Sequence, residues 1–214
     1  MTASPISQTF QAHHNAGQLP RSNKKSWIGN EVKVPDTQHL SLPEPEAGLE
    51  HIRQSPKDEG ALRMVVRRPR EDERETVQTA EPDLQQGLIG DNWKIRGNKN
   101  APDGSANIKA QVTFMNSRTI GLPAQNEERW PLAGDQLYID MDLSGKNLPP
   151  GMRLEIGTAA LEVTAVPHTG CNKFAIRYGT DATRFVNSPE GKRLHLRGIH
   201  ANVVRVGDAV RKIS

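Results

Sequence analysis

The sequence lacks several features that would assign it to a broad class of protein. It contains a single cysteine, which excludes an internal disulfide and gives no sign of an oxidising compartment. Hydrophobic residues make up only 35% of its 214 residues, so part of the chain is expected to be loop or tail. No stretch approaches the roughly 18 to 20 apolar residues that a membrane helix needs. Residues 1–20 lack the apolar core of a secretory signal. We therefore expect a cytoplasmic protein that does not associate with a membrane.

Aromatic residues are also scarce, and the charge is unevenly distributed. Aromatics account for 4% of the chain, and no interleaved aromatics form a stacking platform, so nucleic acid is not an expected partner. The net charge is +3, but residues 171–214 carry +6 and the rest carries −3. Such an excess beside the cysteine suits an anionic ligand such as a phosphate, although a solvated basic surface explains it equally well.

The composition divides the chain into two parts. Residues 1–38 are rich in Ser, Gln, Asn, Thr and Pro and have no apolar periodicity, which predicts a disordered N-terminal tail. His13 and His14 resemble a metal-binding pair, but adjacent histidines in a tail are usually solvated. Residues 39–214 are expected to form one domain.

Short strands punctuated by glycine and proline dominate this second part. The expected strands are residues 62–68, 74–79, 110–115, 136–140, 152–156, 160–166, 193–196 and 199–206. The expected helices are residues 45–53, 124–130 and 181–187, and residues 70–75 are expected to form a solvated hairpin tip. This pattern predicts a mostly β fold, a closed barrel or a sandwich.

One segment resembles a known family. Residues 166–174, with the sequence VPHTGCNKF, are similar to the cysteine-bearing motif of MOSC domains, the C-terminal region of molybdenum cofactor sulfurases. The resemblance extends to other segments between Leu40 and Val210, namely residues 87–93, 134–144, 147–151, 153–157 and 197–204. It implies a closed β-barrel of MOSC type with a few short helices, in the stand-alone short form of the family.

The resemblance also implies a chemistry. Family members include amidoxime- and hydroxylamine-reducing molybdenum enzymes and domains fused to pyridoxal-phosphate cysteine desulfurases. The family cysteine is a persulfide carrier or a molybdenum ligand, and it corresponds to Cys171. This chain shows neither a desulfurase domain nor the separate N-terminal barrel of the amidoxime reducers. Pyridoxal phosphate would therefore enter only through a partner desulfurase.

Cys171 is the expected centre of the site, because both chemistries need a thiolate. Gly170 would allow a tight turn, and His168, Lys173 and Arg177 lie within six residues, so the surroundings favour the thiolate. We expect Cys171 to lie at a concave site with at least one of His168, Arg177 and Arg197 close by.

Other residues are assigned candidate roles around that thiol. His168 is a candidate proton donor, or it holds the cysteine loop or caps a strand end. Arg177 and Arg197 are candidates for phosphate binding, as is Arg193, because guanidinium groups match phosphate oxygens. Gly198 would let the backbone approach a ligand. The remaining cofactor-binding candidates are Thr169, Asn172 and Lys173, with Asn172 either contacting a pterin edge or making a turn.

Three polar segments elsewhere deserve mention. Residues 91–93 lie near the pocket mouth if the resemblance holds, and residues 116–118 follow a strand end and form a further pocket candidate. The acidic cluster of Asp135, Asp140 and Asp142 lacks the ligand spacing of a calcium loop.

Three functions follow as hypotheses. The first is an oxidoreductase that holds the molybdenum cofactor, with Cys171 as metal ligand and a small molecule as substrate. The second is a sulfur carrier, in which Cys171 forms a persulfide with sulfur from a partner desulfurase. The third is a non-enzymatic barrel that binds an anion. The sequence does not distinguish the first two, and it leaves the substrate, a redox partner and the oligomeric state open.

Overall fold

A curled seven-stranded sheet organises the protein. The computed structural model describes residues 10–11 and 38–206. The predictions for His13, His14 and most of the tail therefore lie outside the described residues. The strand order is β3 (Glu75–Val77), β2 (Ala61–Arg67), β8 (Leu137–Asp140), β7 (Val112–Asn116), β11 (Ile199–Val206), β10 (Ala159–Val163) and β9 (Arg153–Ile156). Two small sheets pair β1 (Phe10–Gln11) with β4 (Thr79–Ala80) and β5 (Pro82–Asp83) with β6 (Gly87–Leu88).

The burial of each strand follows from its place in the sheet. All residues of the central strand β7 are buried, because both of its faces are covered. In β11 burial alternates, so that Ile199, Ala201 and Val203 face the core while His200 and Asn202 do not. Neighbouring strands are antiparallel except for β7 and β8, which are parallel and are joined through helical segments.

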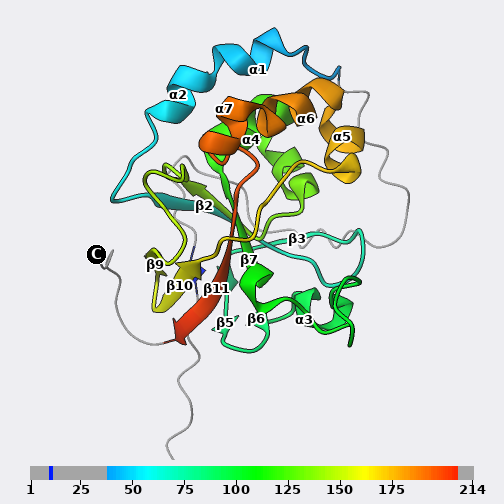
Figure 1. Cartoon of the computed structure of the whole chain (residues 1–214), viewed down its shortest axis with the longest axis vertical. Helices are drawn as coiled ribbons and strands as arrows, with labels where there is room; N and C mark the ends of the chain where they lie inside the picture. The colour runs from blue at the N-terminus through cyan, green and yellow to red at the C-terminus, as the bar shows by residue number, and fades with distance from the viewer. Residues whose placement is uncertain (1–9, 12–37, 207–214) are drawn as a thin grey trace, which may run out of the picture.

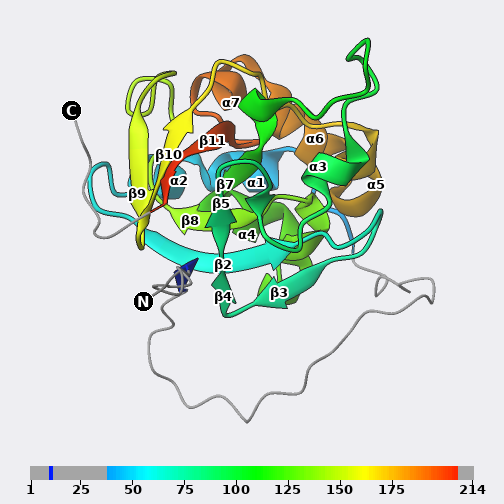
Figure 2. The ribbon, with the colours of Figure 1, turned by 90° about the horizontal axis from the view of Figure 1, so that it is seen from below.

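The sheet bends into a half-barrel at two register shifts. One lies between Leu62 and Met64, where β2 pairs with β8, and the other between Ala160 and Leu161, where β10 pairs with β11. An extra residue in one strand bends it and increases its twist, and Figure 2 shows β2 arching beneath the other strands. The expected closed barrel is wrong, because the end strands β3 and β9 do not pair with each other within the described residues.

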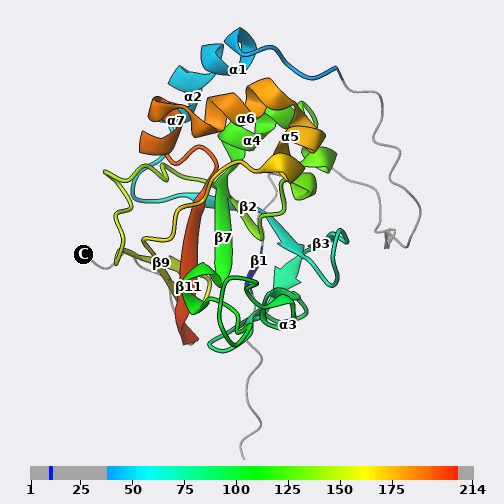
Figure 3. The same cartoon turned by 45° about the vertical axis from the view of Figure 1, so that its right-hand side comes forward.

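The helices gather mainly at one end of this sheet, as Figure 1 shows. They are α1 (Pro43–Ala47), α2 (Leu49–Arg53), α4 (Ser117–Ala124), η2 (Glu127–Ala133), α5 (Asn172–Tyr178), α6 (Thr180–Asn187) and α7 (Pro189–Arg193). Helix α3 (Trp93–Arg96) lies at the other end, and η1 (Ile108–Ala110) precedes β7 (Figure 3). One apolar cluster fills the curl of the sheet and a second lies under the helices. No helix within the described residues is long and apolar enough to cross a membrane.

Most predicted strands are present, but the helix predicted over residues 45–53 is divided at Gly48 into α1 and α2, and two further local predictions fail. Residues 193–196 do not form a strand, because Arg193 ends α7 and His195 adopts a left-handed φ of 50°. Residues 124–130 are not one helix, because α4 ends at Ala124 and Gln125 also has a positive φ, of 59°. Helix α5 was not predicted at all, although Phe174 and Tyr178 stand one turn apart and are both buried.

Candidate functional site

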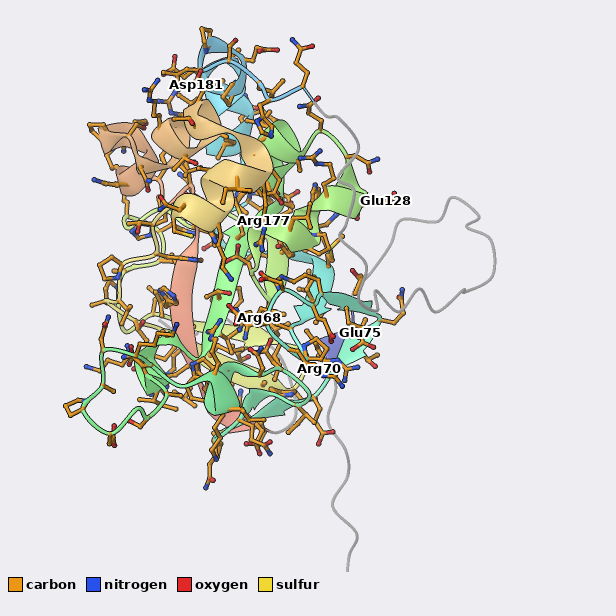
Figure 4. The ribbon with its side chains drawn as sticks, turned by 90° about the vertical axis from the view of Figure 1, so that its right-hand side faces the viewer. Arg68, Arg70, Glu75, Glu128, Arg177 and Asp181 are labelled. Carbon is orange, nitrogen blue, oxygen red and sulfur yellow. The ribbon has the colours of Figure 1, made fainter. Side chains whose placement is uncertain are left out.

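A basic pocket of about 480 Å³ opens between α5, α3 and the β2–β3 hairpin. Its charged lining consists of Arg68, Arg70, Arg74, Arg96, Lys173 and Arg177, together with Glu71 and Asp72. Cations therefore exceed carboxylates by four. Figure 4 shows Arg177 on the same side of the molecule as Arg68 and Arg70, although it lies more than 100 positions further along the chain. The arrangement suits a small anionic ligand.

Cys171 lies exposed in this pocket, directly before α5. The preceding loop is fixed by Asn187, whose side chain accepts a hydrogen bond from the Gly170 N–H at 2.9 Å and donates one to its carbonyl at 3.0 Å. The reason expected for Gly170 is wrong, since its φ is not left-handed. A Cβ there would instead lie 3.0 Å from Cγ2 of Val186, so the glycine is needed for close packing against α6.

Two histidines with their rings in contact, tilted by 41°, lie at the same pocket. The ring centroids of His168 and His200 are 4.4 Å apart. Nδ1 of His200 lies 3.2 Å from the Val166 carbonyl, which only accepts, so that nitrogen carries the hydrogen and Nε2 is left as an acceptor. Burial lowers the pKa of His168 well below its ordinary value, with a further effect from Arg197, and burial also lowers the pKa of His200. Both rings are therefore neutral at neutral pH, and His168 is not an imidazolium proton donor there.

A buried ion pair supports the histidines from behind. Arg197 Nη1 donates to Asp135 Oδ2 at 2.6 Å, its Nη2 donates to the Ala133 carbonyl at 2.9 Å, and its guanidinium lies over the Phe174 ring. The other carboxylate oxygen, Asp135 Oδ1, has no hydrogen-bond partner in the described structure and lies 3.6 Å from the equally unpartnered Nδ1 of His168.

This arrangement changes the interpretation of Arg197 and Gly198. Arg197 does not line the pocket, because Asp135 holds its guanidinium in the interior, so it is not placed to bind phosphate. Gly198 has a φ of 110°, and a Cβ there would lie 2.0 Å from the Phe114 carbonyl oxygen. The glycine therefore permits close contact with β7 rather than the approach of a ligand.

The opposite wall is built on a second buried ion pair. Arg68 donates to both carboxylate oxygens of Asp91, at 2.8 and 2.9 Å, and to the Gly134 carbonyl at 2.9 Å. Asp91 also accepts the Trp93 N–H at 2.9 Å. The pair thereby anchors the loop whose next residues, Asn92 and Trp93, line the pocket. This is where the family resemblance had placed residues 91–93.

Among the described residues, carboxylates act on Arg74 and Arg96 only at a distance. Within residues 38–206 neither arginine forms an ion pair, and Arg74 Nε has no hydrogen-bond partner. Burial lowers the pKa of both groups, and the charges of Arg177 and Arg68 lower that of Arg74 further. The charge of Asp72 offsets part of this shift in the pKa of Arg74, and the charges of Asp91 and Glu71 do the same for Arg96. An anion bound in the pocket would offset the repulsion that each of these arginines experiences from its cationic neighbours.

The hairpin tip folds against the mouth of the pocket. Lys173 Nζ lies 3.1 Å from Glu71 Oε1 and 3.2 Å from Asp72 Oδ1, and Arg177 Nη2 donates to the same Asp72 oxygen at 2.9 Å. Burial would raise the pKa of Asp72, but the hydrogen bond and charge of Lys173, with the charge of Arg177, hold it below its ordinary value. The tip is exposed, as expected, and it also pairs with two of the candidate ligand-binding residues.

The other sequence candidates are not part of the pocket lining. Thr169 and Asn172 are exposed. Arg193 pairs with Glu190 on its own helix. Asn116 caps α4, while Arg118 pairs with Asp140. Sequence spacing gives no signal for four lining residues, Arg68, Arg74, Arg96 and His200, because only the fold brings them to the pocket of Cys171.

Comparison with known proteins supports the fold alone. No family model and no curated protein matches the sequence. Among solved structures the chain is similar to the YuaD protein from Bacillus subtilis, with a TM-score of 0.52 and 15% identity over 72% of this chain and 94% of that one. It is more distantly similar to a hypothetical protein, with a TM-score of 0.47 and 18% identity over 73% of this chain and 66% of that one. For YiiM from Geobacillus stearothermophilus the TM-score is 0.34, with 15% identity over 50% of this chain and 55% of that one.

Proposed function

We propose that the pocket binds a small phosphate-bearing molecule and that Cys171 is its reactive group. The observation that carries this proposal is the position of the chain's one thiol, exposed in a pocket whose cations exceed its carboxylates by four.

We further propose that the protein is of MOSC type and that the ligand is the molybdenum cofactor. This cofactor is a phosphorylated pterin whose own sulfur atoms bind the metal, so the chain needs to supply one soft ligand, Cys171. Arg74 and Arg96 would hold the phosphate, and the neutral His200 would accept a hydrogen bond through Nε2. A volume of about 480 Å³ suits a molecule of this size. When bound, the group would supply redox chemistry at the metal, which makes the protein an oxidoreductase.

Sulfur transfer is the second candidate, and the exposure of Cys171 favours it. A partner protein could reach this thiol directly. The Cys171 thiolate would attack the outer sulfur of a persulfide on a partner cysteine desulfurase. A new sulfur–sulfur bond would form on Cys171, the bond in the partner would break, and the partner cysteine would leave as its thiolate. Pyridoxal phosphate would belong to the partner.

Metal and pterin analysis would distinguish the two candidates. The protein is purified from a host that synthesises molybdenum cofactor, as wild type, as Cys171→Ser and as Thr169→Ser, whose side chain lies outside the pocket. Stoichiometric molybdenum in the wild type and Thr169→Ser, but not in Cys171→Ser, would support the oxidoreductase. A molybdenum-free protein that gains one sulfur atom on Cys171 from a desulfurase would support the carrier. If Cys171→Ser behaved as the wild type in both assays, Cys171 would not be the reactive group.

A further inference from the structure

The cations of the pocket fall into two groups that differ in their counter-charges. Within residues 38–206, Arg74 and Arg96 form no ion pair, so their charge is available to a ligand. Lys173 and Arg177 stand at the mouth beside Cys171 and already hold carboxylates, those of Glu71 and Asp72. The protein therefore supplies direct carboxylate partners to Lys173 and Arg177, whereas carboxylates act on Arg74 and Arg96 only from beyond ion-pair distance among the described residues.

The ion pairs at the mouth of the pocket can separate at little cost in free energy. The side chains of Glu71 and Asp72 are 82% and 58% exposed, and that of Lys173 is 54% exposed. Ion pairs this exposed contribute little to stability. Arg177 also donates to the Leu132 carbonyl at 2.7 Å through Nη1, a bond that does not involve the tip. Its guanidinium would therefore stay in place if the hairpin tip moved away.

We propose that Lys173 and Arg177 form a second anion-binding subsite, which Glu71 and Asp72 occupy as internal competitors of the ligand. A phosphate ester with a second anionic group would bind through Arg74 and Arg96 and displace the tip at the mouth. That second group would then lie beside Cys171, where the chemistry takes place. This inference rests on the proposed binding of an anion in the pocket, and it adds where the second charge of the ligand is recognised.

The test compares two variants of the same hairpin. Asp72 has a left-handed φ of 59°, a conformation that asparagine also tolerates, so Asp72→Asn removes the charge without straining the turn. The matched control is Glu75→Gln, which removes one charge from β3, where Glu75 pairs with Arg67 outside the pocket lining. Calorimetric titration with inorganic pyrophosphate should show about 3- to 10-fold tighter binding to Asp72→Asn than to the wild type. Glu75→Gln should change the affinity less than about 2-fold.

Two further measurements test whether the gain in pyrophosphate affinity arises at the mouth of the pocket. Lys173→Gln should weaken pyrophosphate binding, and adding it to Asp72→Asn should abolish the gain. Hydrogen exchange of residues 70–74 in the wild type should rise when pyrophosphate binds, because the tip is released. Equal effects of Asp72→Asn and Glu75→Gln, or weaker binding to Asp72→Asn, would overturn the competition.

The outcomes also separate this inference from the proposed function. If the wild type binds pyrophosphate and Arg74→Gln weakens that binding, but Asp72→Asn does not differ from Glu75→Gln, only the second subsite is refuted. Binding to Asp72→Asn but not to the wild type would support the internal competitor most strongly. If neither the wild type nor Asp72→Asn binds pyrophosphate, both proposals are wrong.

Discussion

The buried pair between Asp135 and Arg197 should be the most sensitive point of the site. Asp135 is fully buried, the Arg197 side chain is 7% exposed, and their charged atoms are 2.6 Å apart. Asp135→Asn keeps the shape of the side chain but removes its charge. The guanidinium would then stay buried without its counter-charge, although it would keep its contacts with the Ala133 carbonyl, the Met115 sulfur and the Phe174 ring.

The expected cost is about 3 kcal/mol of the free energy of unfolding. Removing one partner of a buried ion pair typically costs about 3–5 kcal/mol, because the remaining charge has lost its solvent without compensation. The lower end applies here, since the asparagine oxygen can still accept a hydrogen bond from Arg197. The control Asp140→Asn breaks the ion pair with Arg118. The side chains of Asp140 and Arg118 are 27% and 19% exposed, so this change should cost about 1 kcal/mol.

Urea denaturation at pH 7.5 would measure both values. Replacing both partners, as Asp135→Asn with Arg197→Met, should restore part of the lost stability, because no unpaired charge is then left in the interior. An Asp135→Asn variant that loses no more than Asp140→Asn would refute the idea that this pair organises the wall behind His168.

Three other predictions concern pH, the thiol and a glycine. The folded-state pKa values of His168 and His200 lie below the unfolded value near 6.5, so as the pH falls the unfolded chain takes up protons first. The contribution of the two histidines to the free energy of unfolding should therefore be constant above about pH 7.5. Below that pH it should fall by up to about 1.4 kcal/mol per pH unit for each histidine. A variant with both histidines replaced by glutamine that loses stability as steeply as the wild type between pH 7 and 5 would show that the histidines are not the cause. Cys171→Ala should change the free energy of unfolding by less than about 1 kcal/mol, because the thiol is exposed, and should leave phosphate binding intact, because the cations bind the anion. A larger loss of stability in urea denaturation, or weaker phosphate binding in calorimetry, would contradict this prediction. Gly198→Ala should lower the free energy of unfolding by about 3 kcal/mol or more, because the new Cβ would lie 2.0 Å from a β7 carbonyl oxygen. The control Gly104→Ala, which is also at positive φ but in open space, should cost about 1 kcal/mol. Equal melting temperatures of the two variants would contradict the steric argument.

The sequence by itself determined the strands and the local surroundings of the thiol. Alternating apolar residues and glycine or proline turns predicted β2 and β11 almost to the residue. The motif around Cys171 placed His168, Lys173 and Arg177 near it, because neighbours in sequence are necessarily neighbours in space. The structure brings these three residues and the thiol to one pocket.

Only the tertiary structure decided how far the sheet closes and which charges are available. Closure of the barrel depends on whether the end strands β3 and β9 meet. The curvature at the two register shifts decides this, and no local sequence pattern encodes that curvature. Arg197 appeared to be a ligand-binding residue until Asp135, 62 positions away, was found to hold it. Arg74 lines the pocket although it belongs to the hairpin of residues 70–75, which the sequence predicted to be a solvated tip. Electrostatic interactions depend on distance and burial, and both are set by long-range packing rather than by sequence spacing.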